Sequence, residues 1–548
     1  MNSAKSERPK KLIADWQTLN RIFIRPEDDA SRQALVKYME QILFGLHDFL
    51  QKHVGITEEV SLKELADRFT DTAIRPHPEK KLAQVISDLV NEIAPHAVNV
   101  ASPYFIGHMT SAIPYFMVHL KTITAALNQN VVKLETSKVV SVVEKQVLAK
   151  IHRLIFRKDI TFYAEHVQSP HTTLGCFTED GTLANITALW VARNGLLPPK
   201  GDFKGCETDG MAAGCLAHGV ERCVVLTSRL GHYSLRKAAG VLGLGNRNVI
   251  GVEVDRQNRI DLKMLNDIIR DIEATRGRTR IMAIVGIAGT TETGTVDPLD
   301  DLAEICAAHK AFYHVDAAWG GPTLMSAKYG SYLKGIEHAD AVTIDGHKQF
   351  YMPMGCGMVY FKDPYALDRI AYYARYIARP GSVDLGIKTI SGSREASSLI
   401  LSGALQIMGS RGYALLIDHG IETARQFAVE IEKRALFELV SAPELNILTY
   451  RVCPSQYQEK LRTADVDGRR SINQWLNEVN RQIQVAQREA GVSFVSRTTL
   501  FEENSVRDPI VVLRAVIMNP STTIQILSEI LDEQEELYRG IFLHGGKK

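Results

Sequence analysis

The chain has 548 residues, of which 45% are hydrophobic and 23% charged, and its formal net charge at pH 7 is +1. This composition is typical of a globular protein that buries a large core. A near-neutral chain lacks the concentrated basic charge of nucleic-acid-binding proteins, so we expect no nucleic-acid partner. The start of the sequence is polar and basic rather than signal-like, and no run of about 18 apolar residues predicts a membrane span.

The cysteine pattern favours reduced thiols. The chain has seven cysteines, an odd number, and no C-x-x-C pair. Zinc sites and secreted disulfide frameworks favour closely paired or even-numbered cysteines, so we expect no metal and a cytoplasmic protein. The segment from Pro198 to Gly219 is rich in glycine and proline, and its pattern indicates a surface loop.

Residues 1–115 have a helical pattern. Apolar residues recur at helix spacing from Arg32 to Lys52 and again from Leu82 to Ile93. No motif in the first hundred residues suggests chemistry. We interpret residues 1–115 as a helical N-terminal segment that packs against the rest of the chain or takes part in dimerisation.

Residues 116–396 alternate between short β-branched runs and helical patterns. The apolar runs at residues 224–226, 280–287, 311–315, 341–344 and 357–361 are separated mostly by helical stretches, including 262–273 and 299–309. This alternation predicts an α/β domain with a mostly parallel sheet. Ligands of such sheets bind outside the carboxyl ends of the strands.

Residues 397–548 differ from the preceding part. Long helical patterns extend to about residue 434, strands are expected at 447–452 and 510–518, and helices at 471–490 and 523–538. We expect a smaller α+β C-terminal domain.

Asp316 directly follows one of the apolar runs, within His314-Val315-Asp316-Ala317-Ala318. A partly buried carboxylate at a strand end requires a partner. A pyridinium nitrogen would provide one, and the small residues after Asp316 would let a flat ring approach. The structural alternative is an aspartate that caps a helix.

A lysine follows the next run, in Asp345-Gly346-His347-Lys348, and apolar residues come after it. Burial disfavours the charged form of an amine, and a neutral lysine can form a Schiff base with an aldehyde. Most His-Lys pairs are surface residues. This pair is notable because it lies one strand after Asp316.

Three further motifs suit a polar cofactor. Gly181 and Thr182 precede an apolar helical stripe, where free N–H groups and the helix dipole would bind phosphate. His232, in the sequence GHYS, could stack on a ring. Thr290 begins a threonine-rich loop after the run at 280–287. Helix capping, a core histidine and a tight loop are the respective alternatives.

The order of these motifs resembles the fold-type-I pyridoxal-5′-phosphate (PLP) enzymes. The sequences HVDAAWGG, GHYS and DGHK are similar to those of the group II amino-acid decarboxylases, which include glutamate, aromatic-amino-acid and diaminobutyrate decarboxylases. The resemblance covers roughly residues 101–411 and extends more weakly to the C-terminus.

The resemblance implies a fold, a cofactor and a set of site residues. The fold would be the α/β PLP-dependent transferase fold type I, with a seven-stranded sheet in the large domain, a smaller α+β domain and a homodimer. Lys348 would hold PLP, Asp316 would keep its ring nitrogen protonated, and the cofactor would also contact Gly181, Thr182, His232, Thr290, Ala318, Asp345 and His347.

Two positions qualify the resemblance. The family commonly has a Gly-Gly pair in the phosphate turn, whereas this chain has Asp180 before Gly181. An acid there would repel a phosphate unless it points away. Family members often use a loop tyrosine as proton donor, and Tyr376 is our candidate among three tyrosines in that region.

The segments YFIGHMTSAIP and NQNVVKLE are most similar to bacterial PLP-dependent aspartate 1-decarboxylases, which form β-alanine for pantothenate synthesis. L-Aspartate is therefore the expected substrate, with L-glutamate (giving γ-aminobutyrate) and L-2,4-diaminobutyrate as alternatives. The resemblance also implies that Arg514 binds a substrate carboxylate and that His108 and Thr110 line the side-chain pocket. A structural salt bridge is the alternative for Arg514.

Two other classes of protein fit the sequence less well. A PLP aminotransferase or carbon–sulfur lyase could use the same fold, but the His-Lys pair and the GHYS sequence disfavour it. A cofactor-free binding protein is disfavoured by Lys348 and Asp316, because neither residue is useful in a core without a cofactor.

Overall fold

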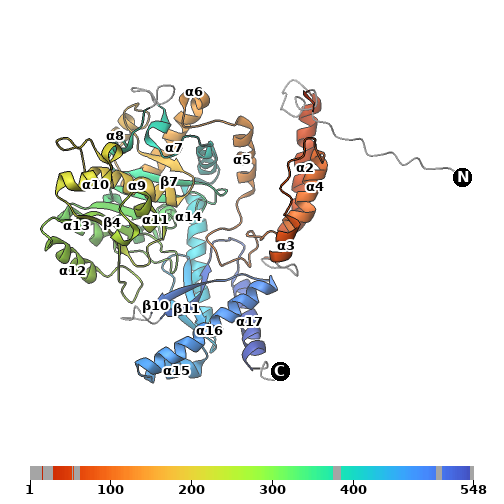
Figure 1. Ribbon diagram of the computed structural model, residues 1–548. Coiled ribbons are helices and arrows are strands. Elements are labelled where there is room, and N and C mark those ends of the chain that lie inside the picture. The colour runs from red at the N-terminus through yellow and green to blue at the C-terminus, as the bar shows by residue number, and fades with distance from the viewer. Residues whose placement is uncertain are drawn as a thin grey trace.

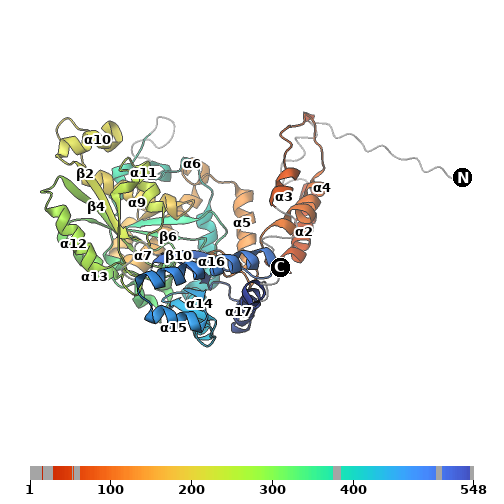
Figure 2. The same cartoon turned by 60° about the horizontal axis from the view of Figure 1, so that its bottom comes forward.

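The computed structural model describes residues 15–16, 29–51, 54, 62–373, 384–501 and 509–543. Within this part of the chain, an α/β body built on a large sheet adjoins a smaller sheet with its own helices (Figure 1). A helical arm near the N-terminus stands to one side of the body in both views (Figures 1 and 2).

The large sheet has seven strands in the order β1-β7-β6-β5-β4-β2-β3. Among these strands, β7 alone runs antiparallel to its neighbours. The predicted mostly parallel, seven-stranded sheet is therefore confirmed. Its strands are β1 (Gly175–Thr178), β2 (Arg222–Ser228), β3 (Val249–Val252), β4 (Thr279–Ile287), β5 (Phe312–Asp316), β6 (Ala341–Asp345) and β7 (Gly357–Phe361).

Helices cover both faces of this sheet because side chains of successive strand residues alternate between the faces. In β2, Val224 and Leu226 join one core cluster, whereas Val225 joins another. The first cluster is completed by α7 (Val139–Phe156), α12 (Leu262–Glu273) and α13 (Leu299–His309). The second is completed by α9 (Gly181–Leu196) and α11 (Ser234–Val241).

The smaller sheet is antiparallel, with the strand order β10-β11-β9-β8. Its strands are β8 (Phe437–Ser441), β9 (Ile447–Val452), β10 (Ser496–Phe501) and β11 (Pro509–Val516). The accompanying helices are α15 (Ser455–Thr463), α16 (Val466–Ala490) and α17 (Ile524–Tyr538). Apolar residues of α16, α17 and these strands form a separate core.

The long helix α14 (Ser397–Glu432) links the two cores, since its residues belong to both. By length and composition it is the one helix of the described ranges that could cross a membrane. It packs instead against α5 (Tyr115–Leu127), α7, β8 and α17, as a core helix of a globular protein does. A break in helical geometry occurs at Gly409 (φ 62°).

The arm contains α2 (Asp29–Gln51), α3 (Leu62–Arg68) and α4 (Leu82–Asp88), and α4 continues as a π-helical turn, η1 (Leu89–Ile93). The helices predicted at residues 32–52 and 82–93 are thus found with nearly the expected bounds. Two short helices, α6 (Leu134–Ser137) and α8 (Ile160–His166), follow in the body.

The loop predicted for residues 198–219 is wrong in part, because this segment contains α10 (Cys206–His218). The glycines that suggested a loop lie at the ends of the helix, Gly205 (φ 112°) and Gly219 (φ 68°), and at a kink within it. Cys206 and Phe203 pack into a small separate apolar cluster, which attaches this segment to the α/β body. All seven cysteines are free thiols, as expected.

Candidate active site

A cavity of about 390 Å³ opens at the carboxyl edge of the large sheet. The parallel strands β5 and β6 end there with Asp316 and Asp345. The lining includes Gly181, Thr182, His232, Asp316, Ala318 and Lys348. Motifs spread over more than 160 residues of sequence therefore meet in one place, as their positions at strand ends predicted.

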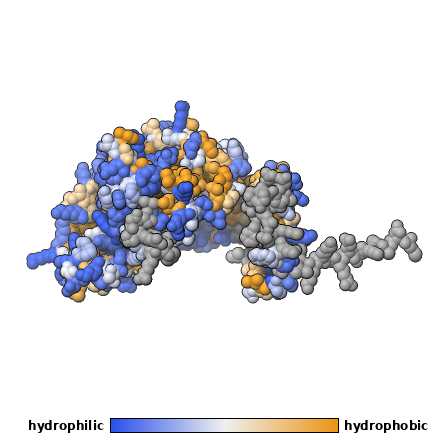
Figure 3. Space-filling model, turned by 90° about the horizontal axis from the view of Figure 1, so that it is seen from above, coloured by the Kyte–Doolittle hydropathy of each residue, from blue (hydrophilic) through white to orange (hydrophobic). Residues whose placement is uncertain are grey.

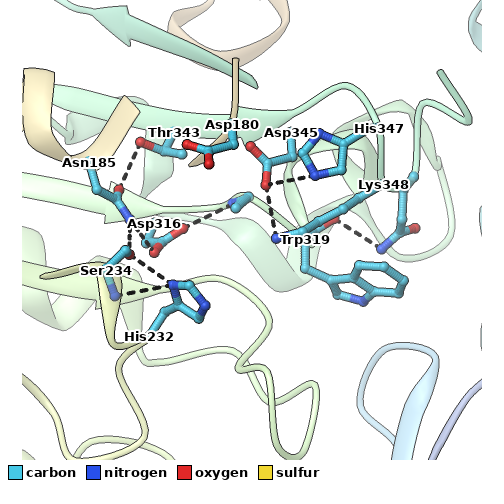
Figure 4. A network of polar contacts seen from close by, with 12 residues as sticks. Asp180, Asn185, His232, Ser234, Asp316, Trp319, Thr343, Asp345, His347 and Lys348 are labelled. Atoms are coloured by element: carbon cyan, nitrogen blue, oxygen red, sulfur yellow. Dashed lines mark hydrogen bonds and ion pairs between the residues drawn. The ribbon is translucent and has the colours of Figure 1, made fainter. Parts of the chain in front are cut away.

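The carboxylate of Asp316 is buried and held by two donors (Figure 4). Asn185 Nδ2 donates to Oδ2 at 2.8 Å, and the Ala318 N–H donates to Oδ1 at 3.2 Å. Asn185 is itself fixed by Thr343, whose hydroxyl donates to Asn185 Oδ1 at 2.9 Å. The network orients an anionic oxygen at the strand end without neutralising it.

His232 lies beside this network, and its Nδ1 is 2.8 Å from Ser234 Oγ (Figure 4). The Asn185 amide also donates to that hydroxyl, at 2.9 Å. Burial lowers the pKa of His232, and the nearby Asp316 charge opposes this effect. A neutral imidazole held in one orientation suits stacking on an aromatic ring.

Lys348 forms an ion pair with Asp345. The distance from Lys348 Nζ to Asp345 Oδ2 is 2.9 Å, and the Asp345 side chain is only 3% exposed. His347 Nε2 lies 3.8 Å from the same oxygen, and its Nδ1 is 2.7 Å from the Cys356 carbonyl. The Oδ1 atom of Asp345 is buried and has no hydrogen-bond partner among the described residues.

The N-terminus of α9 forms the side of the cavity next to Asp345. Asp180 caps this helix, because its carboxylate accepts a hydrogen bond from Leu183 N at 2.8 Å. A Cβ atom on Gly181 would lie 2.8 Å from both carboxylate oxygens of Asp345, so only glycine fits here. Asp180, the residue that departs from the family pattern, is thus used to cap its own helix.

The threonine-rich loop places a different residue at the cavity than the one predicted. Thr290 is fully buried, and its Oγ1 lies 2.7 Å from Thr293 Oγ1. Gly289 and Thr291 line the cavity. A contact between Thr290 and a cofactor stays a prediction, whereas Thr291 is a cavity residue that the sequence did not single out.

Arg514, on β11, is buried near the same site. It donates to Ser496 Oγ at 3.1 Å and to the Gly107 carbonyl at 3.4 Å, while its Nε has no hydrogen-bond partner in the part of the chain that the structure describes. No carboxylate of the described residues lies within ion-pair distance of Arg514. Burial lowers its pKa to about 10, and the charge of Glu292 opposes this effect.

His108 lines the cavity and directly follows Gly107, whose carbonyl accepts a hydrogen bond from Arg514. Its Nδ1 is 3.1 Å from Thr110 Oγ1. Burial and then the Arg514 and Lys348 charges lower the pKa of His108. Glu292, another residue that the sequence did not single out, has a buried Oε2 without a partner, and burial raises its pKa. Tyr376 lies outside the described residues.

A larger cavity, of about 740 Å³, lies at the opposite edge of the sheet. Its walls include Arg280, Asp340, Lys362 and Arg369, near the starts of the parallel strands. By volume alone, this larger cavity would be the better candidate for the active site. The smaller cavity is the better candidate because it holds the buried carboxylate, the paired lysine and the helix N-terminus together.

The smaller cavity fits PLP. A pyridinium nitrogen matches the oriented carboxylate of Asp316, His232 and the small Ala318 both line the cavity that a flat ring would enter, and an aldehyde matches the amine of Lys348. A phosphate matches the N-terminus of α9. The residues are therefore those of a site for a phosphorylated pyridine aldehyde.

Comparisons with known proteins agree with this chemistry. The chain belongs to the pyridoxal-dependent decarboxylase family, whose conserved-domain model matches residues 64–453. It is therefore a PLP-dependent carboxy-lyase with the α/β fold type I.

Individual relatives are similar over nearly their whole length. An aspartate 1-decarboxylase from Aliivibrio fischeri is 44% identical over 96% of this chain and 95% of its own. An L-2,4-diaminobutyrate decarboxylase from Rhizobium meliloti is 25% identical over 94% of both chains. The crystal structure of a TDC from Oryza sativa with PLP and tryptamine has the same fold, with a TM-score of 0.78, 17% identity, and coverage of 95% of this chain and 100% of that chain.

Proposed function

We propose that the chain converts L-aspartate to β-alanine and CO2 with PLP. The observation that carries the substrate is Arg514, a buried cation without a carboxylate partner in the described chain, next to the cavity of Lys348. A buried cation favours a ligand of opposite charge. The similarity to an aspartate 1-decarboxylase supports the same substrate.

In the proposed site, Lys348 would bond the cofactor aldehyde, and the N-terminus of α9 at Gly181 and Thr182 would bind the phosphate. Asp316 would keep the ring nitrogen protonated, and His232 and Ala318 would contact the ring. Bound PLP supplies an electron sink for the electron pair left on Cα as CO2 departs. Asp345, His347 and Thr290 complete the cofactor surroundings.

At the substrate end, Arg514 binds the side-chain carboxylate, and His108 and Thr110 line that part of the pocket. His108 is neutral at pH 7, because its pKa is lowered from 6.5. It therefore adds a hydrogen-bonding group without a second charge. Tyr376 remains our candidate for the residue that delivers a proton to Cα.

Product analysis tests this function. The protein is incubated with PLP and, in separate reactions, with L-aspartate, L-glutamate and L-2,4-diaminobutyrate. We expect β-alanine from L-aspartate at a higher kcat/KM than either alternative product. A preference for diaminobutyrate would contradict the role of Arg514, because the side chain of that substrate is cationic.

We also propose a homodimer. The arm exposes an apolar stripe at helix spacing on α2, namely Val36, Met39, Leu43 and Leu50. The body exposes Tyr115, Val118, Ile123 and Leu127 on α5, and apolar side chains gather on the face seen in Figure 3. Two apolar surfaces on one chain allow the self-complementary contact that a two-fold dimer needs.

We place the domain boundaries at residues 115/116 and 396/397. They separate the helical N-terminal segment, the PLP-binding domain and the C-terminal domain. We propose a cytoplasmic location, which seven free thiols support because disulfides are rare in that compartment.

A further inference from the structure

The carboxylate of Asp345 has an unusual set of neighbours. Its Oδ2 pairs with Lys348 Nζ at 2.9 Å, whereas its Oδ1 is buried without any hydrogen-bond partner. Burying a carboxylate with one oxygen unpaired is costly. The ion pair with Lys348 therefore offsets part of this cost.

The same carboxylate faces the place where a phosphate would bind. Both oxygens of Asp345 would lie 2.8 Å from a Cβ atom at Gly181, the first residue of α9. Asp180, which precedes Gly181, adds a second carboxylate, and both aspartates line the cavity. A phosphate dianion that arrives here meets two negative charges, against the partial positive charge of one helix N-terminus.

The other groups around Asp345 do not neutralise its charge. His347 Nε2 lies 3.8 Å from Asp345 Oδ2. His232, in the loop after β2, is near enough for the Asp345 charge to raise its pKa, but burial lowers that pKa by more. Cys356, just before β7, is a neutral thiol, because burial raises its pKa far above the usual range and the Asp345 charge raises it further. Lys348 is the neighbour that neutralises Asp345, and it is also the residue whose amine must react.

We propose that Asp345 is a proton-accepting counter-ion of Lys348: it holds the ammonium form in the cofactor-free chain, takes one proton from it when PLP arrives, and stays at the phosphate end as a neutral carboxyl. The idea rests on the proposed function, because it takes Lys348 as the residue that bonds the cofactor. A neutral carboxyl removes one negative charge from the phosphate end and gives its free oxygen a donor role.

The atoms balance in this step. One ammonium proton of Lys348 moves to Asp345, which leaves a neutral amine. The nitrogen lone pair then bonds to the aldehyde carbon. The aldehyde oxygen leaves as water with the two remaining amine hydrogens, so that a C=N double bond remains and Asp345 keeps its proton.

The test is the rate of PLP loading into the cofactor-free protein. Stopped-flow absorbance follows the yellow band of covalently bound PLP from pH 6.5 to pH 9 in wild type, Asp345→Asn and Asp180→Asn. Wild-type loading should accelerate as pH rises. Because Asp345→Asn no longer stabilises the ammonium form, we expect loading about fivefold faster at pH 7 and a flatter pH profile.

Asp180→Asn is the matched control. It removes a carboxylate from the same end of the cavity but retains a side-chain oxygen that can cap α9. Its loading rate should keep the wild-type pH slope. Pyridoxamine 5′-phosphate, which lacks the aldehyde, reports docking alone in all three proteins, and thermal melting confirms that each is folded.

An Asp345→Asn protein with the wild-type loading rate and pH slope would overturn the proposal. Slower loading of this variant at every pH would do the same, because Asp345 would then promote loading instead of holding Lys348 in its unreactive ammonium form. The underlying function fails separately: a Lys348→Ala protein that gains the same yellow band as wild type would refute the role of Lys348, whatever Asp345→Asn does.

Discussion

The chemistry of this site depends on a few side chains held at strand ends. Asp316 accepts hydrogen bonds from Asn185 and from the Ala318 N–H, so its carboxylate is fixed before any ligand binds. Electrostatic groups that are oriented in advance need no reorganisation during the reaction. Lys348 lies at the end of the neighbouring strand, and its ion pair with Asp345 fixes the amine in the same way.

Replacement of Arg514 should affect recognition of the substrate side chain. For Arg514→Gln, we expect kcat/KM for L-aspartate to fall by about 10- to 100-fold, mainly through KM, because a charge-assisted hydrogen bond contributes about 1.5–3 kcal/mol. Steady-state kinetics measure this. Arg497→Gln, on the adjacent strand β10, is the control, because Arg497 is exposed and pairs with Gln484. An unchanged KM in Arg514→Gln would refute the clamp.

The sequence indicated the strand-end residues but not their partners. Asp316 and Lys348 follow apolar runs, and this local pattern sufficed to predict their place at the cavity. Asn185 was one turn into a helix, and nothing local showed that its amide reaches Asp316, 131 positions away. Glu292 and Thr291 were missed for a similar reason, because only the turn of their loop decides which side chain faces inward.

At the scale of elements, long apolar runs were predictable and short edge elements were not. The central strands β4, β5 and β6 are buried on both faces, so their sequences are almost continuously apolar. The edge strands β1 and β3 have only four residues each, too few for a clear period. The helix α10 was hidden by glycines that end and kink it.

The contact between α7 and β7 should make stability depend on pH. His152, on α7, is fully buried, with Nε2 3.0 Å from the Phe361 carbonyl of β7 and Nδ1 2.8 Å from Tyr163 Oη. Burial lowers its pKa from 6.5 to about 3. Between these values, the unfolded chain binds a proton that the native chain does not, so this contribution to stability is full above pH 6.5 and is lost as pH falls.

We expect His152 to account for about 2 kcal/mol of the stability lost between pH 7 and pH 5. Urea unfolding at the two pH values measures the loss in wild type and in His152→Gln, where it should be smaller by that amount. His171→Gln, at an exposed position before β1, should lose as much as wild type. Equal losses in wild type and His152→Gln would exclude His152 as the cause.

At the scale of the whole molecule, two cores are joined by α14, and the candidate substrate clamp comes from the smaller sheet. Arg514 lies on β11, whereas the proposed cofactor residues lie at the carboxyl edge of the large sheet and in the segments beside it. Arg514 also contacts Gly107, in the segment that follows the arm. In the proposed function, recognition of substrate and cofactor therefore depends on how the two sheets are held against each other.

The exposed arm predicts dimerisation. We expect light scattering after gel filtration to give twice the mass of one chain, and Leu43→Glu to shift the protein toward monomer, because Leu43 belongs to the apolar stripe of α2 and is 47% exposed, so a charge there would have to be buried. Leu216→Glu, at an 85% exposed position of α10, should remain dimeric. A monomeric wild type, or a dimer that Leu43→Glu leaves intact, would contradict the interface.

The most direct test of the proposed reaction is to follow which carboxyl carbon leaves. L-Aspartate labelled with carbon-13 at the α-carboxyl in one reaction and at the β-carboxyl in another is incubated with the protein and PLP, and CO2 and the amino-acid product are analysed by mass spectrometry. The proposed site predicts labelled CO2 from the α-labelled substrate alone, with β-alanine as product. Labelled CO2 from the β-labelled substrate with alanine as product, or no CO2 from aspartate while glutamate yields γ-aminobutyrate, would contradict the assignment.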